Sequence, residues 1–158
     1  ISITKQRTSY QRNNNSTLNI YLANAKKMDC ITDNSIDFIC THPPYADIIC
    51  YSDSIPDDIS LHNYDDFLLE MQRVAEECYR VLKPNHYCSF MIGDIRKNGN
   101  VITLGFKLME EFSKSKFILK EIIIKEQHNC KYTSYWLNND SMKRMYLLAH
   151  EYIFVMKK

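Results

Sequence analysis

The stretch from Ile36 to Tyr45, I-D-F-I-C-T-H-P-P-Y, constrains the fold of this chain more than any other. Its first residues form a short apolar run that favours a buried strand. The run ends at Pro43 and Pro44, which cannot donate ladder hydrogen bonds and which restrict each preceding residue to extended conformations. We therefore expect His42 and Tyr45 on a stiff, non-helical turn at the carboxyl end of a strand, where open α/β sheets bind ligands. Taken alone, the turn also fits a strand end without any chemistry.

The composition is typical of one soluble, intracellular domain. The chain has 158 residues, 45% apolar and 25% charged, and a net charge of +1, so composition alone does not indicate nucleic-acid binding. None of the six cysteines forms a Cys-x-x-Cys pair, which indicates a reducing, cytoplasmic compartment and no structural metal site. No apolar run is long enough to span a membrane, and no signal peptide is visible.

The order of periodic segments predicts an α/β fold. Besides the strand before the prolines, we expect a helix tail over 1–12, a strand over 18–23, a helical turn over 24–29, a helix over 64–82, a strand over 86–93, a basic loop over 95–101, a helix over 103–115, and strands over 117–126 and 147–156. Alternating helices and strands favour a layered, largely parallel sheet. Because no helix separates the last two strands, we expect them to form an antiparallel pair at the sheet edge.

Two irregular segments are candidates for binding. The stretch over 46–63 is long for a connector and indicates a binding loop or lid. Residues 127–146 interleave aromatic and basic side chains, a mixture that can hold phosphates and stack on bases. The alternative for this second segment is a solvated loop whose aromatic rings pack on the sheet edge.

Four stretches, in this order, resemble the amino-group methyltransferases that act on DNA bases, the adenine-N6 and cytosine-N4 methylases. They are D-N-S-I-D-F-I-C-T-H-P-P-Y (Asp33 to Tyr45), which is similar to the family's catalytic turn [DNS]-P-P-[YFW], C-Y-R-V-L-K-P (Cys78 to Pro84), M-I-G-D (Met91 to Asp94) and H-E-Y-I-F-V-M-K-K (His150 to Lys158). The resemblance spans residues 18–158. It implies a partial, Rossmann-like class I methyltransferase sheet, and a single but incomplete catalytic domain over residues 1–158.

The chain departs from the family pattern at two points. The family's Gly-rich cofactor loop, F-x-G-x-G, is absent, since the chain holds only three glycines and no Gly-x-Gly. The chain also begins at Ile1 and not at Met, so we expect a fragment whose missing loop lies N-terminal to Ile1. The second departure is His42, where the family usually has Asp, Asn or Ser.

The resemblance implies an S-adenosyl-L-methionine-dependent reaction on double-stranded DNA with a flipped target base. The side chain at position 42 and the carbonyl of Pro43 would accept hydrogen bonds from the target amine, Pro44 would stiffen the turn, and Tyr45 would stack on the base. A neutral imidazole has one acceptor nitrogen and an imidazolium has none. We therefore expect His42 to act while neutral; the alternatives are a structural histidine or an inactive copy.

Three further residues have two interpretations each. Asn24 is a candidate for the cofactor's adenine or a turn residue, and Thr41 is a candidate for the cofactor side or a buried strand end. Asp94 either lines the site or caps the next loop, and we favour the cap.

Three functions remain open from the sequence. The first is methylation of cytosine N4 or adenine N6 in a restriction-modification or orphan system. The second is methylation of RNA or of a protein glutamine, because similar Pro-Pro turns serve those reactions. The third is a catalytically silent fragment that binds DNA or a partner.

Overall fold

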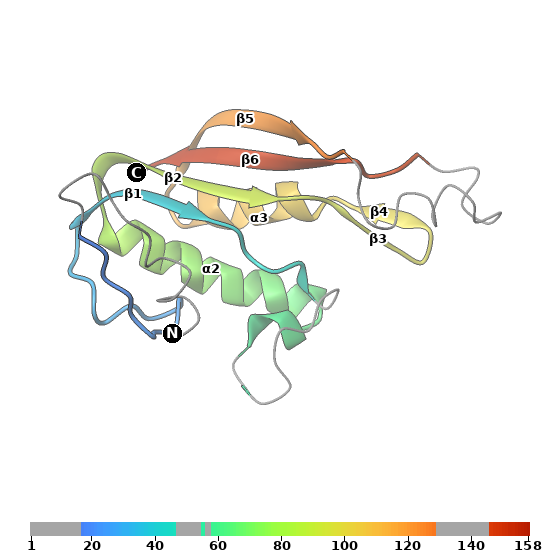
Figure 1. Ribbon diagram of the computed structural model, residues 1–158. Helices are drawn as coiled ribbons and strands as arrows, with labels where there is room; N and C mark the ends of the chain where they lie inside the picture. Colours follow the sequence, from blue (N-terminus) through green and yellow to red (C-terminus); the bar gives the residue numbers. More distant parts are fainter. Residues whose placement is uncertain (1–16, 47–54, 56–57, 129–145) are drawn as a thin grey trace.

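The computed structural model describes residues 17–46, 55, 58–128 and 146–158 (Figure 1). Their elements, in chain order, are strand β1 (Ile36–Thr41), the short 3-10 helix η2 (Ile59–Leu61), helix α2 (Tyr64–Val81), strands β2 (Leu82–Ile92), β3 (Ile95–Lys97) and β4 (Asn100–Ile102), helix α3 (Leu104–Lys114), and strands β5 (Ile118–Glu126) and β6 (His150–Lys157). The predictions over 1–12 and most of those over 46–63 and 127–146 lie outside the described residues.

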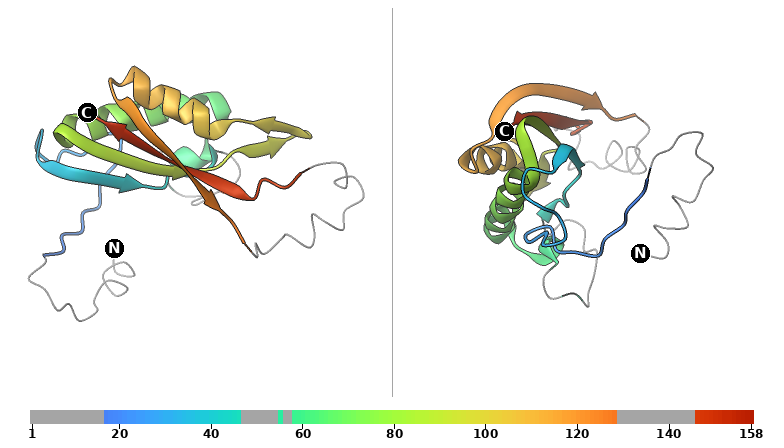
Figure 2. Two further views of the ribbon diagram at one scale, coloured as in Figure 1. Left: turned by 90° about the horizontal axis from the view of Figure 1, so that it is seen from above. Right: turned by 90° about the vertical axis from the view of Figure 1, so that its left-hand side faces the viewer.

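The main sheet has the strand order β1-β2-β6-β5. Strands β1 and β2 are parallel, whereas β6 runs antiparallel to both β2 and β5. Helices α2 and α3 pack against each other and cover one face of this sheet (Figures 1 and 2). Strands β3 and β4 form a separate hairpin that projects beyond the end of β2. The expected α/β class and the antiparallel pair of final strands are confirmed.

Helix α2 forms where the sequence has both a cap and an apolar stripe. The side chain of Asn63 accepts hydrogen bonds from the backbone N–H groups of Asp65 and Asp66, each at 3.0 Å, which satisfies two otherwise unpaired donors. The two aspartates in the first turn and Arg80 in the last suit the helix dipole. The buried stripe contains Phe67, Met71, Val74, Ala75, Cys78 and Val81. This stripe holds α2 against the sheet.

A cluster of aromatic rings fills the core between the helices and the sheet. Phe90 of β2 stacks on Phe112 of α3, with ring centroids 4.3 Å apart, and on Phe154 of β6, with centroids 5.2 Å apart. All three side chains are fully buried. On the opposite face of the sheet, Phe38 and Tyr87 are cross-strand neighbours and both are exposed. The alternation of β2 therefore separates a packed face from an accessible one.

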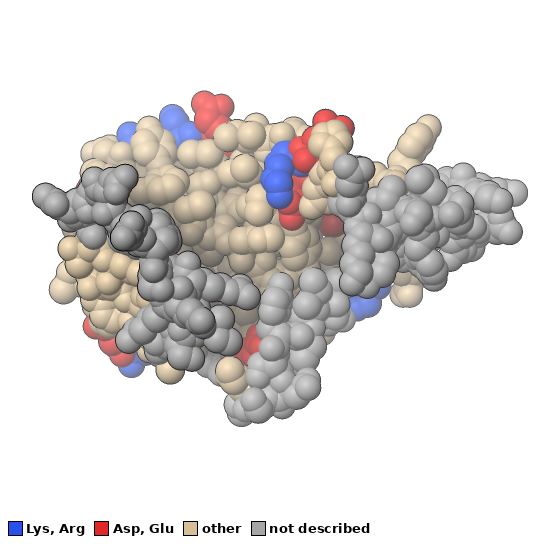
Figure 3. Space-filling view, in the orientation of Figure 1, with Lys and Arg blue, Asp and Glu red and all other residues tan. Residues whose placement is uncertain are grey.

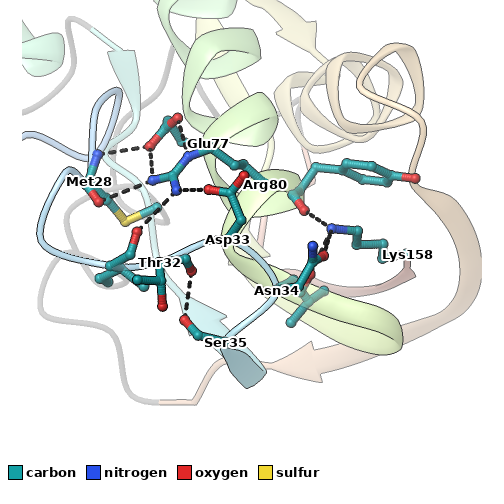
Figure 4. A network of polar contacts seen from close by, with 11 residues as sticks. Met28, Thr32, Asp33, Asn34, Ser35, Glu77, Arg80 and Lys158 are labelled. Carbon is teal, nitrogen blue, oxygen red and sulfur yellow. Dashed lines mark hydrogen bonds and ion pairs between the residues drawn. The ribbon is translucent and has the colours of Figure 1, made fainter.

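A polar network holds the entrance of β1 against the end of α2 (Figure 4). The guanidinium of Arg80 donates to Glu77 and Asp33 and to the backbone carbonyls of Met28 and Ile31. The hydrogen bonds with Glu77 and Asp33 raise the pKa of Arg80 above its ordinary value, so this side chain remains charged. The segment before β1 is thus fixed to the helix that packs beneath the strand.

Lys158, after β6, binds backbone carbonyls at the same end of α2. Lys158 Nζ donates to the backbone carbonyls of Tyr79 and Leu82 and to Asn34 Oδ1 (Figure 4). Carbonyls at the end of a helix lack partners within the helix, and a cation satisfies them well. β1, α2 and β6 are therefore joined at one end of the sheet, opposite the Pro-Pro turn.

The sequence prediction was wrong in four local details and in the direction of most strands. Residues 18–23 form no strand, and residues 24–27 form a tight turn closed by a bridge, not a helical turn. The predicted loop over 95–101 is the β3–β4 hairpin, whose Asn98-Gly99 turn has positive φ at both residues, as two-residue hairpin turns require. β2 begins directly after α2, four residues before the predicted start. The described strands are not largely parallel, because β6 enters the sheet between β2 and β5 in the opposite direction.

Gly105 allows α3 to lie close to β6, and replacing it is expected to destabilise the fold. A Cβ atom at this position would lie 2.8 Å from Cδ2 of the Tyr152 ring. Alanine usually stabilises a helix by up to about 1 kcal/mol relative to glycine. Here the overlap should outweigh that gain, so Gly105→Ala should lower the free energy of unfolding by about 1–2 kcal/mol.

Urea-induced unfolding would test this prediction. Ser113→Ala, on the exposed side of the same helix, is the matched control and should change stability little. A Gly105→Ala protein at least as stable as the parent would mean that the approach of α3 to β6 is not constrained by this glycine.

Candidate active site

The Pro-Pro turn lies at the carboxyl edge of the parallel strands. Thr41, the last residue of β1, pairs with Phe90 of β2, so the two strands end close together. The turn that follows β1 and the Gly93-Asp94 segment that follows β2 therefore share one edge of the sheet. The sequence predicted the turn at this edge, which is the edge where open α/β sheets bind ligands.

The turn has one open side and one buried side. The side chain of His42 is 46% exposed, whereas Pro43 is buried and Tyr45 is half-buried. The rings of His42 and Tyr45 meet edge to face, with centroids 5.7 Å apart and planes at 84°. The imidazole is therefore accessible from outside while the residues after it are packed into the edge.

A buried glutamate of β6 connects the turn to the sheet. Glu151 is only 6% exposed, and its Oε1 accepts a hydrogen bond of 2.6 Å from the Tyr45 hydroxyl. The same oxygen lies 3.7 Å from His42 Nε2. Its other oxygen, Oε2, accepts from Lys125 Nζ on β5 at 2.6 Å, and the Tyr45 hydroxyl in turn accepts from the Gly93 backbone N–H at 2.9 Å. A single carboxylate thus contacts groups from β5 and from the Pro-Pro turn.

The charge of Glu151 is stabilised by its neighbours. Burial acts to raise the pKa of its carboxyl group, but hydrogen bonds from Lys125, Tyr45 and Gln127 and the charge of Lys125 outweigh burial and lower the pKa to about 2. The carboxylate is consequently ionised at neutral pH and is paired with the ammonium group of Lys125.

The two candidate cofactor residues lie in different surroundings. Asn24 is exposed in a tight turn, where its side chain accepts from the Lys26 backbone N–H at 2.9 Å. Lys26 in turn forms an ion pair of 2.6 Å with Glu70 of α2. Thr41 is half-buried at the end of β1, directly before His42. Neither position reveals a cofactor contact, so both assignments remain predictions.

Asp94 caps a helix at the site edge. Its Oδ1 accepts from the Gly105 backbone N–H in the first turn of α3 at 3.2 Å, and its Oδ2 accepts from the Tyr152 hydroxyl at 3.2 Å. The prediction that Asp94 caps the next loop is therefore wrong in its partner, because the two contacts of the carboxylate are with the first turn of α3 and with Tyr152 of β6.

Sequence reasoning missed Glu151 and Lys125 as residues of the site. Both belong to predicted strands, but only the register of β5 and β6 makes them direct cross-strand partners. The available signal was a pair of charged residues within two apolar strands that were expected to pair. That signal does not reveal which charges meet, because a shift of one residue exchanges the two faces of a strand.

The surface over the strands is largely uncharged (Figure 3). Acidic and basic side chains lie mainly at its margins, apart from one small mixed group over the strands. Among the described residues there is no group of three or more His, Cys, Asp or Glu side chains arranged to hold a metal ion. In that same part of the chain, none of the helices is both long and apolar enough to cross a membrane.

Comparison with known proteins identifies DNA methylases as the relatives of this chain. The profile of the DNA methylase family of N6/N4 methyltransferases matches residues 36–158. The orphan methyltransferase M.BamHII of Bacillus amyloliquefaciens is 26% identical over 128 residues, which are 81% of this chain and 40% of that protein. The chain thus spans about 40% of the length of this curated relative.

Solved structures show the same fold at low sequence identity. A Thermus thermophilus protein, provisionally described as a DNA modification methylase and solved in complex with S-adenosyl-L-methionine, is 23% identical with a TM-score of 0.61, over 85% of this chain and 52% of that chain. The cytosine-N4-specific PvuII DNA methyltransferase is 16% identical with a TM-score of 0.62, over 87% of this chain and 48% of that chain. Likeness at these identities shows a methyltransferase fold.

Acidification is expected to weaken the fold through Glu151. Its folded-state pKa, about 2, lies below the ordinary value of 4.5, so the unfolded chain binds a proton first as the pH falls. The stabilisation is therefore fully present above the ordinary value and is lost as the pH falls toward the folded value. A lowering of this size is worth roughly 3 kcal/mol.

This prediction is tested by measuring the free energy of unfolding from about pH 6 to about pH 2, a range that includes both the ordinary and the folded-state pKa of Glu151. The free energy of unfolding that is lost on acidification should be smaller by roughly 3 kcal/mol in Glu151→Gln, because the amide cannot titrate. Glu121→Gln, at an exposed glutamate of β5, should leave the pH dependence close to that of the parent. Equal pH dependence in the parent and in Glu151→Gln would contradict the prediction.

Proposed function

This chain belongs to the N6/N4 DNA methylase family, and we propose that it methylates an exocyclic amino group of a DNA base, cytosine N4 or adenine N6. The observation that carries the proposal is the exposed imidazole of His42 on a rigid turn, beside a buried carboxylate, at the ligand-binding edge of the sheet. The whole protein's substrates and activity are part of the proposal, because the chain spans less than half of M.BamHII.

The chain's own residues fit the base side of this reaction. The amine lone pair is delocalised into the base ring, and acceptors on the two N–H groups favour a more tetrahedral nitrogen that can attack. We assign these acceptors to the imidazole of His42 and the backbone carbonyl of Pro43, which the two prolines hold in a fixed direction. The exposed imidazole can also take the proton that the nitrogen loses after alkylation and release it to water.

The methyl group would come from S-adenosyl-L-methionine, which this family uses. The chain contains no Gly-rich loop to hold that cofactor, and we assign to it only the candidate contacts Asn24 and Thr41. Tyr45 serves as a stacking surface for the flipped base, because the two hydrogen bonds of its hydroxyl orient its ring.

The β3–β4 hairpin is suited to contact the DNA backbone beside this site. It follows Gly93 and Asp94 directly and projects away from the sheet edge (Figure 2). Its residues include Arg96 and Lys97 and no acidic side chain. Arg96 donates to the Gly99 and Tyr146 carbonyls, which orients its guanidinium along the hairpin. Basic side chains on a projecting ribbon favour phosphate contacts.

Replacing His42 should abolish most of the activity without removing DNA binding. We expect His42→Ala to lower the methyl-transfer rate by about 100- to 1,000-fold, as loss of one preorganised hydrogen-bond partner does elsewhere. His42→Asn should recover part of the rate, because its amide oxygen is an acceptor. The rate is measured as transfer of labelled methyl from S-adenosyl-L-methionine to DNA by the native protein that carries this chain. Mass spectrometry of the nucleosides then identifies the target base.

The matched control is His86→Ala, at the opposite end of β2. Its Nε2 lies 3.5 Å from Asp37 at the amino end of β1. This variant should keep the parental rate. Wild-type activity in His42→Ala would refute the assignment of His42. DNA binding without any methylated base in the parent protein would support a catalytically silent subunit, whereas methylation of RNA or protein would redirect the proposal to another substrate.

Replacing Lys97 should weaken DNA binding uniformly across sequences. If its ammonium neutralises one phosphate, Lys97→Ala should reduce the slope of log affinity against log salt by about one. Lys120→Ala, at an exposed lysine near the start of β5, is the control because it lies toward the opposite end of the sheet. An unchanged slope in Lys97→Ala would exclude the hairpin lysine from the DNA contact.

A further inference from the structure

Glu151 has more contacts with the catalytic turn than a structural ion pair requires. A carboxylate buried in the sheet is satisfied by Lys125, whose Nζ lies 2.6 Å from Oε2. Its second oxygen, Oε1, instead contacts two side chains of the turn, Tyr45 at 2.6 Å and His42 at 3.7 Å. The geometry of Oε1 therefore needs an explanation beyond the pairing of β5 with β6.

The position of Oε1 has a direct consequence for the protons on His42. A neutral imidazole carries its proton on either Nδ1 or Nε2, and the other nitrogen is the acceptor. The distance of 3.7 Å from Nε2 to Oε1 is too long for a direct hydrogen bond but short enough for strong electrostatic interaction. A lone pair on Nε2 would face a negative oxygen, whereas an Nε2–H would face it favourably.

We propose that Glu151 is a positioning residue for the catalytic turn, which keeps the proton of His42 on Nε2 and leaves Nδ1 as the ring's acceptor for the target amine. The inference rests on the proposed function for its catalytic consequence. The proton arrangement itself does not depend on it. This arrangement explains how an imidazole serves where the family usually has Asp, Asn or Ser: the carboxylate behind the ring defines which nitrogen accepts.

The same oxygen orients the second ring of the turn. The Tyr45 hydroxyl donates to Oε1 and accepts from the Gly93 N–H, so both of its hydrogen-bonding directions are defined. A Cβ atom at position 93 would lie 3.4 Å from that hydroxyl and 3.3 Å from the His150 carbonyl, so glycine leaves room for the approach. Glu151 thus holds the imidazole and the stacking ring in one mutual geometry, edge to face.

Nitrogen NMR of the protein with 15N-labelled histidine tests the proton arrangement directly. In the parent protein, His42 should be mainly the Nε2–H tautomer, with the large downfield shift of an unprotonated nitrogen at Nδ1. In Glu151→Gln, the amide oxygen should stay with the Lys125 ammonium, so that the amide NH₂ faces Nε2. The NH₂ group is a donor, and the major tautomer should therefore switch to Nδ1–H.

Two further variants separate the charge of Glu151 from simple packing. Tyr45→Phe keeps the carboxylate and should retain the Nε2–H tautomer. Glu126→Gln removes an exposed glutamate that lies 3.4 Å from His128, and it should leave the His42 signals unchanged. An Nδ1–H tautomer in the parent protein, or no switch in a folded Glu151→Gln, would overturn the proposal. If Glu151→Gln fails to fold, Glu151→Ala removes the carboxylate without adding a donor and should lower the Nε2–H fraction of His42. An unchanged fraction in that variant would overturn the proposal.

The catalytic consequence has its own measurement. With the Nδ1 acceptor lost, Glu151→Gln should lower kcat on the order of 100-fold while KM for S-adenosyl-L-methionine stays near the parental value. A tautomer switch without any effect on methyl transfer would refute the positioning role. A parent protein that shows the Nε2–H tautomer but no methyltransferase activity would instead refute the proposed function and leave the proton arrangement intact.

Discussion

A buried carboxylate must be paired, and the way in which Glu151 is paired determines the geometry of this site. Removing a charge from water costs several kcal/mol unless other groups replace its hydration. Here Lys125 supplies the counter-charge and Tyr45 supplies a hydroxyl, so the requirement to satisfy one charge joins β5, β6 and the turn after β1.

The opposite end of the sheet is fixed by a second set of polar contacts. Arg80 and Lys158 satisfy backbone carbonyls at the end of α2 and in the segment before β1. β1 is thereby held at its entrance by α2 and at its exit by the hydrogen bonds of Tyr45. A strand fixed at both ends presents the Pro-Pro turn with little freedom, and preorganisation of this kind is what electrostatic catalysis needs.

Much of the fold could be predicted from the sequence because local patterns were strong. The apolar stripe of α2 and the run that ends at Pro43 determine their elements through periodicity and through the geometry of proline. The β3–β4 hairpin was missed although Asn98-Gly99 is a strong turn signal, because the flanking strands have only three residues each and little alternation. The insertion of β6 between β2 and β5 was also missed, since strand order depends on long-range pairing that no local pattern encodes.

The sequence by itself determined the Pro-Pro turn, the histidine that precedes it and the resemblance of the whole series to a family of methylases, because these depend on residues close together in the chain. Only the tertiary structure decided that Glu151 lies behind His42 and Tyr45, since the residues are separated by more than a hundred positions. Their contact follows from the register of β6 on β2 and from the depth at which the turn packs, and both are properties of packed strands. In the arrangement that we propose, the choice of the accepting nitrogen depends on this tertiary contact, whereas the presence of the imidazole depends on the sequence alone.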